Sequence, residues 1–106
     1  NHWNQITRNA NGKKNRTAFE ITITIQDAWD LFLAQDRRCA LTGLPIELGK
    51  QRTASLDRID SNMGYISGNI QWVHKDVNKM KNTFTQEHFI TMCKKVADTH
   101  AIGVYN

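Results

Sequence analysis

The sequence predicts an α+β fold, a small single domain built on a two-stranded antiparallel hairpin and a helix, with additional helices flanking it. The first observation is the stretch at 54–81, where extended segments on either side of the turn SNMG lead into a helical pattern of apolar residues. The second is the segment at 25–32, where apolar residues recur at helical spacing. The third is the length of 106 residues, which leaves room for one hydrophobic core.

Local signals justify the elements of the first half. FEITIT at 19–24 alternates and is β-branched, which predicts a short extended entry. Thr24, with Asp27 three residues further on, predicts the cap of a helix. The apolar stripe of that helix, which we expect in the core, consists of Ile25, Ala28, Trp29 and Phe32. RCALTGLPIEL at 38–48 is predicted to be a turn segment, because a glycine and a proline interrupt it.

The second half is predicted to form strand, turn, strand and helix. A strand is expected from Ala54 to Ile59, and the return strand is expected to begin at Tyr65. From about Gln71 the pattern becomes helical. One face of this helix carries Trp72, Val73, Val77 and Met80, and another carries His74, Asn78 and Lys81. Thr85 is a predicted N-cap for a final helix. The residues that this last helix is expected to bury are Phe89, Met92, Cys93 and Val96.

The positive charge is concentrated at the N-terminal end. The net charge is +4, and residues 1–16 hold four basic residues and no acidic one, while the remainder holds ten of each. The four are Arg8, Lys13, Lys14 and Arg16. We therefore divide the chain into a basic arm at 1–18 and a domain at 19–106 with its core motif at 54–82. A basic arm is typical of an extension that binds a polyanion, and a solvated charge run is the alternative.

Composition excludes several classes of protein. No apolar run approaches the roughly 20 residues that span a bilayer, so we expect a soluble protein with no membrane partner. The chain does not start with the charged and then apolar pattern of a signal peptide, and by default we expect a cytoplasmic location in a bacterial or phage-infected cell. Cys39 and Cys93 lie far apart in different contexts, so no disulfide framework is expected.

Short polar side chains crowd the stretch SLDRIDSNMGYISGNIQWVHKDVNKMK at 55–81. Asp57 and Asn78 offer oxygen ligands, and Mg²⁺ is commonly held by one or two protein groups, with waters and a substrate phosphate completing the site. His74, one helical turn before Asn78, is a candidate general base. On spacing alone, structural roles fit equally well: Asp57 as a turn cap, Asn69 as a left-handed turn residue and His74 as a solvated position.

This stretch resembles the core of the HNH nucleases, which have the ββα-metal fold. Asp57 falls at the aspartate of the family's Asp-His dipeptide, and Asn69 falls at its central asparagine. Asn78 matches the final Asn/His metal ligand, and Lys81 matches the lysine that often follows it. GlyTyr at 64–65, GNIQWV at 68–73 and the upstream turn RCALTGLPI also resemble family segments, so the resemblance covers about residues 37–90.

The resemblance implies an endonuclease that hydrolyses DNA phosphodiester bonds with one divalent metal, Mg²⁺ or Mn²⁺. It implies that Asp57 and Asn78 hold the metal, that Asn69 bonds backbone groups to hold a loop, and that Lys81 contacts a phosphate or a helix neighbour. The side chains expected to follow the phosphate backbone are Lys13, Lys14, Arg16, Lys75, Lys79 and Lys81. Sequence specificity is expected from an attached module or a partner protein.

Arg58 is the departure from the family pattern that matters most. It stands where the family has the histidine that serves as general base, and an arginine keeps its proton at ordinary pH. Three outcomes are open: His74 is the base, a metal-bound water loses its proton without a protein base, or catalysis is lost and a DNA-binding module remains. Arg58 suits a phosphate in all three, and pairing with Asp60 at the strand end is its structural alternative.

A second departure concerns zinc. Many relatives bind a structural Zn²⁺ with two CxxC pairs, whereas here Thr42 follows Cys39 at the second position, and His74 and Val77 occupy the other two. At most two of four ligands remain, so structural zinc is not expected. The same correspondence leaves open whether His74 points toward the turn or toward the metal.

Overall fold

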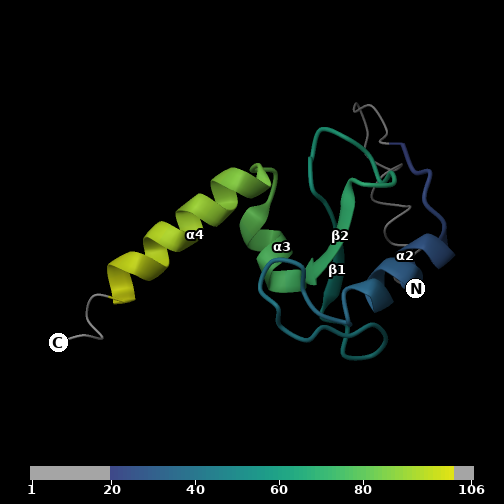
Figure 1. Ribbon diagram of the computed structural model, residues 1–106, viewed down its shortest axis with the longest axis horizontal. Coiled ribbons are helices and arrows are strands. Elements are labelled where there is room, and N and C mark those ends of the chain that lie inside the picture. The colour runs from purple at the N-terminus through teal and green to yellow at the C-terminus, as the bar shows by residue number, and fades with distance from the viewer. Residues whose placement is uncertain (1–19, 102–106) are drawn as a thin grey trace.

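The computed structural model describes residues 20–101. In chain order its elements are α2 (Ile25–Ala34), β1 (Ala54–Arg58), β2 (Ile70–His74), α3 (Lys75–Lys81) and α4 (Gln86–Ala101). The two strands form an antiparallel hairpin, and Figure 1 places α2 and α3 on either side of it, with α4 extending away from the rest. The predicted α+β class, a two-stranded antiparallel hairpin with helices around it, is therefore confirmed.

Helix α2 begins as the sequence predicts. The Thr24 hydroxyl accepts a hydrogen bond from the Asp27 N–H (3.0 Å), and the Asp27 carboxylate accepts one from the Thr24 N–H (2.9 Å), which together form a capping box. Of the predicted stripe, Ala28 and Phe32 are buried, whereas Ile25 and Trp29 are substantially exposed. The core-facing surface of α2 is thus narrower than the sequence pattern predicts.

The register of the hairpin assigns different chemistry to its two faces. Asp57 lies opposite Gln71, and Leu56 lies opposite Trp72. Because successive side chains on a strand alternate between faces, the Asp57 pair and the Leu56 pair face in opposite directions. Both faces are buried at this point, since all four residues are less than a tenth exposed. At this point the hairpin therefore buries an apolar pair on one face and a polar pair on the other, and we call these the apolar face and the polar face.

The apolar face packs against α2. The Trp72 indole N–H donates to the Ala28 carbonyl (2.8 Å), and the Phe32 ring meets the Trp72 ring edge-on with 5.7 Å between centroids. Gln35, at the end of α2, exchanges hydrogen bonds with the backbone of Trp72 through both ends of its side-chain amide. The buried core of which these residues are part is Ile23, Ala28, Phe32, Cys39, Ile46, Ala54, Leu56, Trp72 and Val73.

Two predictions for the second half are wrong. The return strand does not begin at Tyr65, which instead forms a parallel bridge with Ile21. Strand β2 runs over 70–74, so the residues from Gln71 to His74 belong to a strand and not to a helix. The run Ile-Gln-Trp-Val-His fits both periods because its apolar residues are adjacent, and pairing with β1 decides between them.

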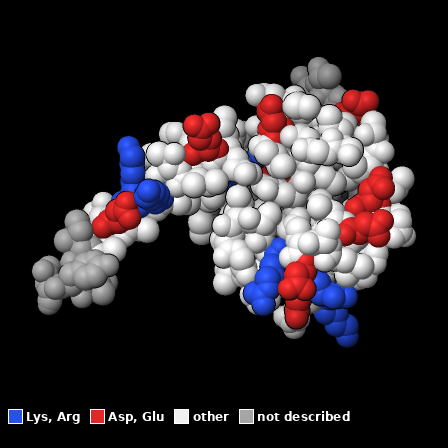
Figure 2. Space-filling view, viewed as in Figure 1, with Lys and Arg blue, Asp and Glu red and all other residues white. Residues whose placement is uncertain are grey.

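Helix α4 differs most from its prediction. The Thr85 hydroxyl accepts a hydrogen bond from the His88 N–H (3.1 Å), as expected of an N-cap. No residue of α4 is buried: Phe89 is half-buried, and Met92, Cys93 and Val96 are exposed. Figure 2 shows the helix projecting from the body of the molecule. The predicted burial of this face is wrong for the described residues.

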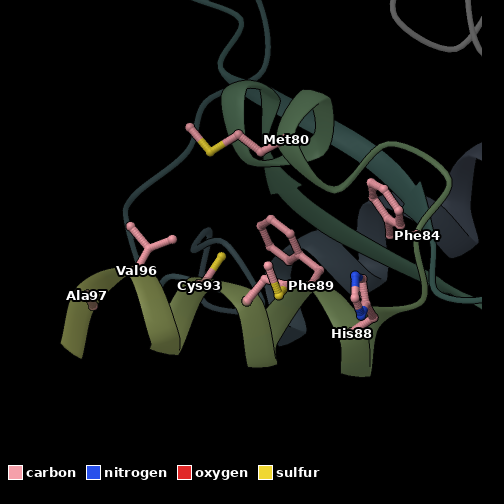
Figure 3. Close-up of a pocket in the computed structure, with 8 residues that line it drawn as sticks. Met80, Phe84, His88, Phe89, Cys93, Val96 and Ala97 are labelled. Atoms are coloured by element: carbon pink, nitrogen blue, oxygen red, sulfur yellow. The ribbon is translucent and has the colours of Figure 1, made fainter. Parts of the chain in front are cut away.

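A groove of about 500 Å³ lies between this helix and the end of α3. Figure 3 shows the side chains that α4 turns toward Met80 and Phe84. The residues that line this groove are Met80, Phe84, His88, Phe89, Met92, Cys93, Val96 and Ala97.

Among residues 20–101, the helices are too short or too polar to form a membrane span.

Candidate functional site

Asp57 is the centre of the polar face of the hairpin. It lies near the end of β1 and is only 5 % exposed. One carboxylate oxygen accepts a hydrogen bond from the side-chain amide of Gln71 (2.9 Å), the residue opposite it in the register. Both oxygens lie within 3.3 Å of the Lys81 ammonium. A carboxylate this deeply buried requires such partners, and here β2 supplies Gln71 and α3 supplies Lys81.

Lys81 is fully buried, at 0 % exposure. Its ammonium donates to the Asp57 carboxylate and to the backbone carbonyls of Arg58 (3.1 Å) and Ile59 (3.5 Å). Three acceptors thus match its three protons. The expected contact of Lys81 with DNA does not fit this placement, because the ammonium is enclosed by the end of β1. The helix neighbour that the resemblance offers as the other partner is not found either, because the partners of Lys81 lie on β1 and at the residue after it.

Asn69 ties the ends of the loop between the strands together. Its side-chain oxygen accepts a hydrogen bond from the Asp60 N–H (2.8 Å), and its amide donates to the carbonyls of Asp60 (3.1 Å) and Gly64 (2.9 Å). The side chain is buried, so these bonds are shielded from water. These are the backbone contacts expected of Asn69 from the resemblance, and they fix the loop that follows β1.

Asn78 reaches the same region from α3. Its amide donates to the Ser55 hydroxyl (2.6 Å) on β1, which directs the amide toward the polar face. Asn78 and Asp57 both line a small polar cavity of about 110 Å³. The other residues lining this polar cavity are Leu56, Arg58, Ser61, Tyr65, Asn82 and Thr83. The structure therefore brings the two predicted metal ligands to one cavity.

Arg58 lies on the wall of the polar cavity. One terminal nitrogen of its guanidinium donates to the carbonyls of Ser61 (3.0 Å) and Met63 (3.2 Å) in the loop after β1. The guanidinium carbon also lies 5.5 Å from the centroid of the Tyr65 ring, a cation–π distance. Arg58 thus carries positive charge at the position where the family has its histidine.

Tyr65 is a cavity residue that the sequence does not single out as functional. Its N–H donates to the Glu20 carbonyl (2.8 Å), and its carbonyl accepts from the Thr22 N–H (3.1 Å). Burial raises the pKa of the Tyr65 phenol, against the charge of Arg58, which lowers it. The phenol therefore stays protonated throughout the neutral range.

His74 lies away from the polar cavity. It pairs with Ala54 at the far end of the hairpin, three register positions from the Asp57 pair. Its ring accepts a hydrogen bond from the Asp76 N–H (3.1 Å), so His74 is the N-cap of α3. The sequence pattern predicts the helix from about Gln71, but the helix begins at Lys75, so His74 lies at the end of β2 and does not share a helical face with Asn78. His74 as the general base is not consistent with this placement.

Hydrogen bonds surround Cys39, the first of the four positions considered for structural zinc. Cys39 is buried, and its sulfur accepts from the Thr42 N–H (3.3 Å). Burial raises the pKa of this thiol, but hydrogen bonds from Thr42, His74 and Leu41 together hold it below its usual value. Across the described part of the chain, no group of three or more His, Cys, Asp or Glu side chains is placed to hold a metal ion.

The predicted DNA contacts fall into three groups. Lys75 and Lys79 are exposed on α3, where a phosphate can reach them. Lys81 is enclosed, as described above. Lys13, Lys14 and Arg16, together with the whole predicted arm, lie outside the described residues.

The polar cavity offers a divalent metal only a few protein ligands. Asp57 is the one carboxylate among its lining residues, and Asn78 can add an amide oxygen because its nitrogen is the atom that faces Ser55. Mg²⁺ tolerates so few protein ligands where waters and a phosphate complete its shell. Lys81 and Arg58 oppose a bare cation here, so the donor set fits a metal that arrives with a phosphate.

Comparison of this chain with family models, curated proteins and solved structures finds no match. The residues of the site and their geometry therefore provide the basis for a functional proposal.

Gln71 and Tyr65 are the site residues that sequence reasoning missed. Gln71 is recognisable only once β2 is placed in register with β1, because it then lies opposite Asp57. For Tyr65, the signal in the sequence is the preceding glycine. A Cβ at Gly64 would overlap the Glu20 carbonyl oxygen. A glycine that admits another backbone segment marks the adjacent side chain as fixed in position.

Proposed function

We propose that this chain is a divalent-metal-dependent nuclease domain of the HNH type, which hydrolyses phosphodiester bonds in DNA. The observation that carries the proposal is the convergence of Asp57 from β1 and Asn78 from α3 on one small polar cavity. The hairpin-then-helix order, with Asn69 tying the intervening loop, is the arrangement expected of a ββα-metal site.

Each of these residues has a definable task. Asp57 and Asn78 would hold the metal, which when bound polarises a phosphate and stabilises charge on the leaving oxygen. Lys81 holds the Asp57 carboxylate in one orientation and compensates its charge inside the protein. Arg58 supplies positive charge beside the reacting phosphate. Because the described lining residues include no imidazole, the protein's contribution is to bind, orient and stabilise charge.

A second candidate is a DNA-binding module without catalysis. The observation that favours it is the separation of His74 from the polar cavity, with Arg58 at the position of the missing base. Such a module would bind the phosphate backbone through Arg58 and the exposed lysines of α3, and its affinity would fall as salt rises.

The test is nicking of supercoiled plasmid in Mg²⁺, in Mn²⁺ and in chelator. Asp57→Asn is expected to reduce the nicking rate roughly 100-fold or more, because it removes the charged ligand. Asp98→Asn on exposed α4 is the matched control, and His74→Ala should retain activity within about twofold since its ring lies at the other end of the hairpin.

Thermal unfolding of each variant separates loss of the site from loss of the fold. If no metal supports nicking while the folded protein still binds DNA in a salt-dependent way, the nuclease proposal is wrong and the binding module replaces it. If His74→Ala abolishes nicking without unfolding the protein, the assignment of the site to the Asp57 end of the hairpin is wrong.

A further inference from the structure

We propose that Tyr65 is a substrate-contacting residue, whose hydroxyl acts with the Arg58 guanidinium as a clamp for one phosphate group in the polar cavity. The proposal rests on the proposed function only in naming a nucleic-acid backbone as the source of that phosphate. Tyr65 and Arg58 both line the polar cavity, and the guanidinium lies over the tyrosine ring.

The chemistry of the phenol favours a donor role. The Arg58 guanidinium lies over the Tyr65 ring, and because a guanidinium can only donate, it makes no demand on the phenolic proton. The phenol then keeps its own proton to donate. Two donors of this kind, one neutral and one charged, suit the oxygens of a phosphate, for which charge-assisted hydrogen bonds are the strong ones.

The charges around the polar cavity favour an anion. The Asp57 carboxylate is balanced by the buried Lys81 ammonium, which is 3.2 Å away. Arg58 adds a positive charge to the wall of the polar cavity. A phosphate seated beside Arg58 would be attracted by that charge, and it would also supply the negative charge that a metal on Asp57 and Asn78 would otherwise lack.

The size of the polar cavity matches a phosphate group. Its volume of about 110 Å³ has room for several water molecules, since about 10–15 Å³ of such space holds one. Sites that enclose a whole organic ligand begin at about 300 Å³. The clamp therefore takes a phosphate of a chain that lies mostly outside, and base recognition is not expected from it.

Tyr65 is held rigidly enough to position a ligand. Its N–H and carbonyl are bonded to the segment from Glu20 to Ile23 on one side, and Asn69 holds the carbonyl of Gly64 just before it. A Cβ at Gly64 would overlap the Glu20 carbonyl oxygen, so the close approach of these two backbones requires glycine. Preorganised donors lose little freedom on binding and so contribute more to affinity.

Affinity for a fluorescein-labelled duplex, measured by anisotropy in chelator, tests the clamp apart from cleavage. Tyr65→Phe keeps the ring beneath Arg58 and removes only the hydroxyl. We expect its Kd to rise roughly 5- to 10-fold, a typical loss for a hydrogen bond to a charged group. Ser67→Ala, which removes an exposed hydroxyl from the same loop, is the matched control and should leave the Kd unchanged.

The salt dependence distinguishes the two partners. Arg58→Gln should lower the slope of log Kd against log salt by roughly 0.9, the value for one phosphate contact, whereas Tyr65→Phe should leave the slope unchanged because it removes no charge. In the double variant the Kd should rise less than the product of the single effects, since both groups hold the same phosphate. Thermal unfolding confirms that the compared variants are folded.

The clamp is wrong if folded Tyr65→Phe binds the duplex with the wild-type Kd. Reduced affinity of Tyr65→Phe supports the clamp even where no variant nicks plasmid, an outcome that removes the nuclease proposal alone. Wild-type affinity of Tyr65→Phe together with metal-dependent nicking removes the clamp and leaves the nuclease.

Discussion

The hairpin with α3 and the final helix α4 distribute polar and apolar groups in opposite ways. The hairpin unit buries a carboxylate and an ammonium, Asp57 and Lys81, with every charged atom hydrogen-bonded. Helix α4 exposes an apolar face that includes Met92 and Val96. In this protein, one region buries a pair of charged side chains and another exposes apolar ones.

This difference shows that burial follows position in the fold more than hydrophobicity. The polar residues are buried because β1 and α3 close over them, and their hydrogen bonds make that burial tolerable. The apolar residues of α4 are exposed because an open groove of about 500 Å³ separates their face from the end of α3. We therefore expect the folding stability of the domain to depend on its polar network and to be nearly independent of the α4 face.

Lys81→Met should produce the largest loss of stability. It leaves the Asp57 carboxylate buried without its counter-ion, and breaking a buried ion pair in this way costs about 3–5 kcal/mol. The free energy of unfolding, measured in urea, provides the test. Lys79→Met on the exposed side of the same helix is the matched control and should change stability by less than about 0.5 kcal/mol.

A double variant sharpens this expectation. Asp57→Leu combined with Lys81→Met removes both charges, and replacing a buried pair with apolar residues is usually much less costly than breaking it. The double variant should therefore be more stable than Lys81→Met alone. Equal loss in Lys81→Met and Lys79→Met would show that the ion pair contributes little and would remove the contrast between the regions.

The same substitution, valine to alanine, can be compared in the two regions. Val73 on β2 is 0 % exposed, whereas Val96 on α4 is 60 % exposed. Val73→Ala should reduce the free energy of unfolding by about 2 kcal/mol, through lost burial and the cavity that remains. Val96→Ala should change it by less than about 0.5 kcal/mol, with alanine's helix propensity acting in its favour.

Urea unfolding of both variants under one set of conditions gives the comparison directly. A loss of 2 kcal/mol in Val96→Ala would mean that the α4 face is covered in solution, and the loss would then depend on protein concentration if a second copy covers it.

Local signals in the sequence predict part of this fold. The capping box at Thr24 and Asp27 and the N-cap at Thr85 involve residues within four positions of each other, so their chemistry is readable without tertiary information. The position of β1 is predicted to within one residue. Asn69, which the resemblance to a known family assigns to the loop, makes the backbone contacts expected of it.

The remaining features depend on long-range pairing. Gln71 to His74 form a strand only because β1 lies beside them, and that pairing moves His74 out of the helix and away from Asp57. Lys81 is buried because it pairs with Asp57, a carboxylate 24 residues earlier in the chain. The residues next to Lys81 in the sequence do not indicate this pairing. The amphipathic pattern of α4 likewise does not predict its exposure, because such a pattern specifies an apolar face and not what packs against it.

Tyr65 provides the smallest effect, a dependence of stability on alkaline pH. Burial raises its pKa above the value of about 10 for an unfolded chain, with Arg58 acting in the opposite direction. The folded state therefore binds the phenolic proton more tightly, and the free energy of unfolding falls as the pH rises above about 10. Below that pH both states keep the proton and Tyr65 contributes no pH dependence.

Subtracting the profile of Tyr65→Phe, measured in urea at each pH, isolates this contribution from other alkaline titrations. Parallel profiles of the two proteins above pH 10 would mean that the phenol is as well solvated in the folded protein as in the unfolded one, and the polar cavity would then not be the enclosed site that a phosphate clamp requires.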